Sequence, residues 1–184
     1  ISRSGWTGER GFEIYSKDDD FNGEALWQYL LCEGAPFQLM ASDVTSMHIR
    51  RLEAGILDYG TDIDQSLNPF ELGLGQFVDL SKDDFIGRRA LLETDRRATR
   101  VMGLRSHDVK PIRGDCLMNE AGDSIGAITA GAWSPSLDCG IGIIRLDRPI
   151  DPDVALRLRT ETGDFQAELC PLPFYDPQKR IPRL

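Results

Sequence analysis

Histidine is scarce in this sequence, and its cysteines are few and scattered. The chain has two histidines, and no C-x-x-C pair occurs among its four cysteines: Cys32, Cys116, Cys139 and Cys170. A structural zinc site needs a cluster of such ligands at short spacing, so no metal site is expected. Isolated cysteines in a chain without a secretory signal indicate reduced thiols, which predicts a cytoplasmic protein.

Positive charge and long apolar runs are also lacking. The 21 Lys and Arg residues are outnumbered by 30 Asp and Glu residues, which gives a formal net charge of -9. An acidic chain lacks a broad basic surface, so we expect no nucleic-acid partner and a weak preference for a cationic small molecule. No apolar run approaches the roughly 18 residues of a membrane-spanning helix, so no membrane partner is expected. The 41% of hydrophobic residues still predicts a folded chain with a core.

The first 95 residues alternate between strand-like and helix-like patterns. Strands are predicted from alternating or short apolar runs at residues 11–15, 36–40 and 77–80. Helices are predicted from apolar spacing at residues 22–34, 43–54 and 86–92. Asn22 and Asp43 have side chains that can cap the first two helices. This rhythm is typical of an α+β fold.

A polar stretch at residues 93–99 separates this part from a region with a different pattern. Short apolar runs, separated by turn signals, follow at residues 101–104, 125–129, 140–146, 154–158 and 165–169. Several short strands at such spacing predict a small β-barrel or sandwich. We therefore expect two domains, at residues 1–95 and 96–184.

Four segments, taken together and in order, resemble one family. They are SGWTGERGFEIY at residues 4–15, RLEAGILDYG at 51–60, the stretch from NPFELGL to DFIGR over 68–88, and ITAGAWSPSL at 128–137. The set resembles the glycine-cleavage T-protein superfamily, which includes aminomethyltransferase and the dimethylsulfoniopropionate demethylase. Each motif alone is weak evidence, but four in the family order span most of the chain.

The resemblance implies an α+β fold in which the C-terminal part of the T-protein folate-binding fold precedes a small C-terminal β-barrel. Residues 1–95 would then be a partial folate-binding aminomethyltransferase domain and residues 96–184 the barrel domain. The implied cofactor is tetrahydrofolate, and the implied donor of a methyl or aminomethyl group is a small methylated amine or sulfonium. The family's catalytic aspartate has no match here. We therefore expect that a missing N-terminal half of the same polypeptide carries it and that this fragment alone is inactive.

The resemblance also implies a cofactor-binding role for Glu13, Tyr15 and Phe174. Glu13 matches the pterin-recognising glutamate of the family, and an ionised carboxylate can accept from a ring N–H and an amino group that lie side by side. Tyr15 would share the strand face of Glu13. Phe174 matches a tyrosine near the family's folate site but lacks the hydroxyl. Structural alternatives stay open, namely a solvent-facing glutamate and a half-buried strand aromatic.

Two substitutions bear on the branch of the superfamily. Trp6 stands where aminomethyltransferases usually have tyrosine, and its indole face could bind a methylated cation as substrate. A core or interface role for this tryptophan is an equal alternative. Met47 lies four residues before Arg51, where glycine-cleavage members carry an arginine that can contact folate. Trp6, with the stretch RSGW that it ends, resembles the demethylase branch, whereas Met47 weakens the aminomethyltransferase interpretation.

Charged and polar residues in and after the RLEAG motif have two interpretations. The set comprises Arg51, Glu53, Tyr59, Asp62 and Asp64. These residues form either a paired internal network that shapes the folate channel or direct contacts to a ligand. The network is favoured because buried charges in proteins are normally paired.

Two other functions stay open. A folate-binding protein without transferase activity would resemble superfamily members that assist iron–sulfur or tRNA-modification proteins, but their distinctive cysteine motif is absent here. The folate domain of a flavin-linked amine oxidase would require a dinucleotide-binding G-x-G-x-x-G motif upstream of Ile1.

Overall fold

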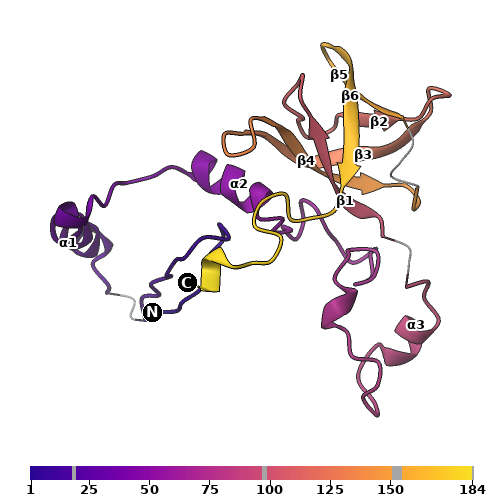
Figure 1. The fold of residues 1–184 in the computed structure, drawn as a ribbon. Helices are drawn as coiled ribbons and strands as arrows, with labels where there is room; N and C mark the ends of the chain where they lie inside the picture. Colours follow the sequence, from indigo (N-terminus) through magenta and orange to yellow (C-terminus); the bar gives the residue numbers. More distant parts are fainter. Residues whose placement is uncertain (18–19, 97–98, 151–154, 184) are drawn as a thin grey trace.

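The computed structural model describes residues 1–17, 20–96, 99–150 and 155–183. Figure 1 shows a β-barrel at one end of the molecule and a long excursion of the chain outside it that carries the helices. The barrel is built from the second half of the chain, and the helices come from the first half. This order agrees with the α+β fold expected from the sequence.

Six antiparallel strands close the barrel in the order β1-β4-β3-β2-β5-β6. Their bounds are β1 Val101–Ser106, β2 Cys116–Met118, β3 Ser124–Ser134, β4 Cys139–Leu146, β5 Leu156–Thr160 and β6 Gly163–Cys170. Closure confirms the predicted barrel and excludes a sandwich. The three-residue β2 was missed because it is too short to show alternation. Residue 154, which begins one predicted run, lies outside the described residues.

Alternating burial is clear in β5, whereas β4 is buried at almost every position. In β5, Leu156 and Leu158 are buried while Arg157 and Arg159 are exposed, as the period of two in a strand requires. The buried leucines join the barrel interior with residues such as Leu104 and Ile144. Burial of one such side chain contributes roughly 1.5–3 kcal/mol, so this interior is the main source of stability.

The predicted helices are confirmed. Helix α1 spans Gly23–Gly34, and the Asn22 side chain accepts from the backbone N–H of Ala25 at 2.9 Å. Helix α2 spans Val44–Glu53 and is capped in the same way by Asp43, which accepts from Ser46 at 2.8 Å. Helix α3, Arg88–Leu92, begins two residues later than predicted.

The three strands predicted in the first half are wrong. Residues 11–15 make one isolated bridge, between Ser2 and Glu13. Residues 36–40 begin inside the 3-10 helix η1, Ala35–Phe37, which Pro36 favours at its start and Gln38 ends in a left-handed conformation. The third strand begins at the last residue of η2, Gly75–Phe77. In the described part of the chain, no neighbouring strand pairs with these segments, and a strand needs such a neighbour.

A second apolar cluster fastens the segment after α2 to the barrel. Leu52 and Leu67 pack there with Val101, Ile141 and Phe174, and α2 lies against β3 and β4. Helix α1, in contrast, has no buried residue, and Figure 1 shows it at the end of the molecule away from the barrel. The last element of the described residues is the 3-10 helix η3, Ile181–Arg183. Among the described residues, no helix is both long and apolar enough to cross a membrane.

Candidate functional site

Glu13, Tyr15 and Ser4 form a small polar cluster at the N-terminal bridge. The backbone of Glu13 exchanges two hydrogen bonds with Ser2, at 2.9 Å each. Glu13 Oε2 accepts a hydrogen bond from Ser4 Oγ and another from the Tyr15 hydroxyl, the latter at 2.7 Å. The predicted common face of Glu13 and Tyr15 is therefore confirmed, although the residues around them do not form a full strand.

The charge state of Glu13 follows from these contacts. The Ser4 hydrogen bond, and then the Tyr15 hydrogen bond, hold the pKa of Glu13 below its usual value, because both favour the ionised carboxylate. The same hydrogen bond to Glu13 raises the pKa of Tyr15, so its hydroxyl stays protonated and donating. Within the described residues, Glu13 Oε1 has no hydrogen-bond partner and can accept from a ligand.

The other two predicted site residues lie in different surroundings. Trp6 is 38% exposed and lies in the same N-terminal loop as the glutamate cluster. Phe174 is buried in the second apolar cluster, with the Arg105 guanidinium 5.8 Å from its ring centre. This position gives Phe174 a clear packing role, whereas its role at a cofactor stays a prediction.

Arg50 is the centre of a cluster that motif reasoning did not single out. It pairs with Glu9 of the N-terminal loop and with Glu53 one turn along α2. Its guanidinium lies 5.1 Å from the ring centre of Tyr175 and donates to Ser136 Oγ at 3.0 Å. The sequence contained one indication of this cluster, because Glu9 belongs to the first motif, at residues 4–15.

Glu53 explains the two serines of the SPSL motif. Its carboxylate is fully buried and accepts from Ser134 Oγ at 2.5 Å and from Ser136 Oγ at 3.3 Å. Its carbonyl accepts from the Tyr175 backbone N–H at 2.9 Å. A buried carboxylate is costly unless it is paired, so these donors tie the end of α2 to the barrel and the C-terminal tail.

Arg51 and Asp62 form a second, fully buried ion pair at 2.7 Å. Asp62 also accepts from Thr129 Oγ1 of β3 at 2.6 Å and from the Asp58 backbone N–H at 2.9 Å. Arg51 donates to the Ile56 carbonyl at 3.1 Å. These contacts support the internal network expected from the sequence rather than direct ligand contact.

Two residues of the expected network lie outside its buried part. Asp64 pairs with Arg145 of β4 at 2.8 Å on the surface. Hydrogen bonds from the Ser66 and Arg145 side chains lower the pKa of Asp64. Tyr59 is largely exposed.

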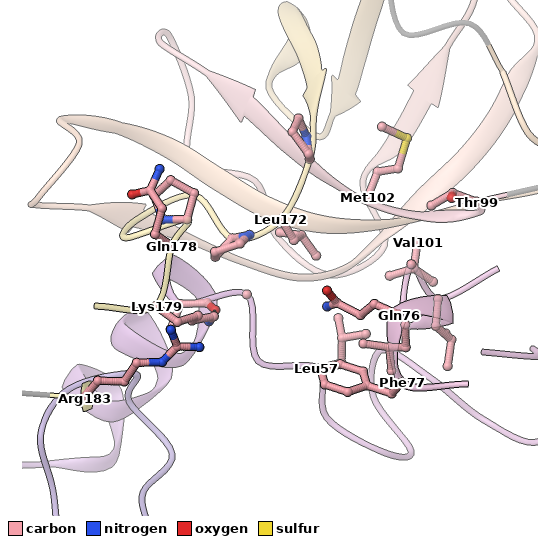
Figure 2. A pocket seen from close by; sticks show the side chains of 18 residues that line it. Leu57, Gln76, Phe77, Thr99, Val101, Met102, Leu172, Gln178, Lys179 and Arg183 are labelled. Atoms are coloured by element: carbon pink, nitrogen blue, oxygen red, sulfur yellow. The ribbon is translucent and has the colours of Figure 1, made fainter. Parts of the chain in front are cut away.

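A cavity separate from Glu13 lies between three segments of the chain. It has a volume of about 770 Å³ and is enclosed by the segment after α2, the start of β1 and the C-terminal tail. Figure 2 shows Lys179 and Arg183 on one side, with Leu57 and Phe77 on the other. None of the predicted site residues lines it. The described residues also contain no group of His, Cys, Asp and Glu that could hold a metal ion.

Comparison with known families matches both parts of the chain. Residues 1–82 match the model of the GCVT N-terminal domain. Residues 99–176 match that of the glycine cleavage T-protein C-terminal barrel domain, which coincides with the closed barrel. The chain belongs to the glycine-cleavage T-protein superfamily. The boundary at residue 95 stays a prediction.

Individual members of this superfamily show the same relation. The aminomethyltransferase of Halothermothrix orenii is 35% identical over 181 residues, which cover 95% of this chain and 49% of the relative. That of Streptomyces avermitilis is 36% identical and covers 97% of this chain and 50% of the relative. The solved aminomethyltransferase T of the Bartonella henselae glycine cleavage system is 27% identical with a TM-score of 0.80, covering 95% of this chain and 49% of that one. The chain thus spans about half the length of these relatives.

Proposed function

We propose that this chain is the C-terminal portion of a tetrahydrofolate-dependent one-carbon transferase that acts on a small methylated or aminomethylated donor. The observation that carries the proposal is the carboxylate of Glu13. It is ionised at neutral pH, hydrogen bonds from Ser4 and Tyr15 lower its pKa further, and one of its oxygens has no partner among the described residues. The free oxygen, Oε1, can accept from an N–H donor of a pterin ring, while Oε2 already accepts from Ser4 and Tyr15. When bound, tetrahydrofolate would supply the nitrogen that accepts the one-carbon unit.

The residues of this chain would bind and orient rather than perform proton transfer. Ser4 and Tyr15 hold the Glu13 carboxylate in one orientation, which reduces the freedom lost on binding. The Arg50 to Glu9 pair fastens the N-terminal loop that carries Trp6 and Glu13 to α2. Through Glu53 and the barrel serines, this loop is linked to the rigid part of the molecule.

Binding of tetrahydrofolate, measured by titration calorimetry, tests the role of Glu13. The Glu13→Gln variant keeps the shape but loses the charge, so its affinity should fall about tenfold or more. Glu24→Gln, which removes the same charge from the exposed first turn of α1, is the matched control. Equal affinities in the two variants would overturn the proposed pterin contact.

We further propose that the partner of this chain is the N-terminal half of the same polypeptide. Helix α1 has no buried residue, and a hollow of about 270 Å³ beside it is lined by apolar side chains such as Trp27, Leu31, Leu39 and Met40. An unpaired apolar surface of this kind favours a covering partner. The chain also spans only about half the length of the relatives described above.

Methyl transfer to tetrahydrofolate tests this partnership. This chain alone should show no transfer, whereas the full-length polypeptide should be active. Screening methylated amines, sulfoniums and an aminomethyl carrier as donors would separate the demethylase branch from the glycine-cleavage branch. Transfer by the 184-residue chain alone would contradict the proposal.

A further inference from the structure

The cavity below the barrel has an unusual balance of charge for this protein. Its wall contains Lys179 and Arg183 but no Asp or Glu, although the whole chain carries 30 acidic residues and a net charge of -9. Positive groups concentrated in a hollow raise the local potential for an anion. The wall is thus electrostatically opposite to the protein as a whole.

Lys179 and Arg183 both have N–H groups that can still donate to a ligand. The Lys179 ammonium donates to the Ala54 carbonyl at the end of α2, and an ammonium has three N–H groups. Lys179 is partly buried, and burial lowers the pKa of its ammonium, whereas Asp176 acts in the opposite direction. The Arg183 side chain makes no ion pair among the described residues. Asp176, a carboxylate that acts electrostatically on Lys179, does not line the cavity, so an anion placed between the two cations would meet no carboxylate of the wall.

The rest of the wall suits an apolar body. It is lined by Leu57, Val101, Met102 and Leu172. The side chain of Phe77, which is 78% exposed, lies on the side of the cavity away from the cations (Figure 2). The volume of about 770 Å³ falls within the roughly 300–1,000 Å³ of small-molecule sites. An elongated molecule could span from the aromatic side to the cations.

We propose that this cavity binds an amphipathic organic anion, with its aromatic or aliphatic body against Leu57, Phe77 and Val101 and its carboxylate at Lys179 and Arg183. The site is separate from the proposed pterin contact, because it includes neither Glu13 nor Tyr15. Its presence or absence therefore does not depend on the proposed transferase activity.

A pair of isosteric probes tests the site on the 184-residue chain. Titration with 1-naphthaleneacetate and with its neutral amide, 1-naphthaleneacetamide, should show saturable binding of both. The acid should bind about tenfold more tightly, the difference that corresponds to about 1.4 kcal/mol. Chemical-shift changes should appear at the side-chain amides of Gln76 and Gln178, which line the cavity.

Three variants separate the charged end from the apolar end. Arg183→Gln should weaken the acid alone, whereas Phe77→Ala should weaken acid and amide equally. Arg180→Gln removes the same charge three residues away, outside the cavity wall, and should change neither. Equal binding of acid and amide, equal effects of the two arginine variants, or no saturable binding would overturn the proposal.

Discussion

Two arginine–aspartate ion pairs differ in burial, and we expect them to differ in their contribution to stability. Arg51 and Asp62 are both buried, whereas Arg145 and Asp64 face solvent. Removal of one partner from a buried pair leaves an uncompensated charge, at a cost of about 3–5 kcal/mol. An exposed pair contributes at most about 1 kcal/mol because water screens it.

The first prediction compares the same substitution at both arginines. Arg51→Met should lower the free energy of unfolding, measured by urea denaturation, by about 3 kcal/mol or more. Arg145→Met should stay within about 1 kcal/mol of the parent chain. The double variant with Asp62→Leu should regain part of the loss, because it removes the orphaned carboxylate. Similar losses in the two single variants would argue against a buried pair.

The second prediction concerns the thiols. Burial raises the pKa of Cys170 to about 11 and also raises the pKa of Cys139, so at pH 8 very little of either is thiolate. Cys32 is exposed on α1. Labelling with a thiol-exchange reagent at pH 8 should modify Cys32 quickly, while Cys139 and Cys170 should react only in urea. Rapid labelling of Cys170 in the Cys32→Ser variant would contradict this.

At the scale of elements, the contact between α2 and β3 includes one buried carboxylate besides its apolar packing. Ser134 of β3 is buried and donates to Glu53 at the end of α2. The third prediction is that Ser134→Ala destabilises the chain by about 1.5–3 kcal/mol, the usual contribution of a hydrogen bond to a charged group. Ser124→Ala, at the exposed start of the same strand, is the control and should change the melting temperature very little. Equal losses of stability in the two variants would contradict the role of Glu53 in linking α2 to β3.

The sequence predicted elements well where their cause is local. The caps at Asn22 and Asp43 need only nearby backbone N–H groups, and both helices form as expected. The barrel runs succeed because each of them finds pairing partners within the described chain. The strand predicted at residues 11–15 fails for the opposite reason, because a single bridge is all the pairing it finds there.

The candidate site was predictable only in part for a similar reason. Tyr15 lies two residues from Glu13, so their shared face followed from strand periodicity. The Arg50 cluster unites the N-terminal loop, α2 and the barrel turn at Ser136, and no spacing rule predicts which of these distant charges meet. The cavity at Lys179 likewise arises from segments that are far apart in the sequence.

At the scale of the whole molecule, stability is unevenly distributed. The barrel strands β3 and β4 run through both apolar clusters. Helix α1 is 12 residues long and buries none of them. Isolated helices of this length are marginal in water, so α1 in this chain lacks the packing that usually stabilises a helix.

The fourth prediction follows from this contrast and is tested by native-state hydrogen exchange. Amides of β3 and β4 should exchange only by global unfolding, whereas amides of α1 should exchange orders of magnitude faster, by local opening. In a longer polypeptide that includes the proposed N-terminal half, the α1 amides should become protected while those of β4 change little. Protection of α1 equal to that of β4 in the 184-residue chain would contradict this. It would mean that α1 is stabilised without a covering partner, and the apolar hollow beside it would no longer support one.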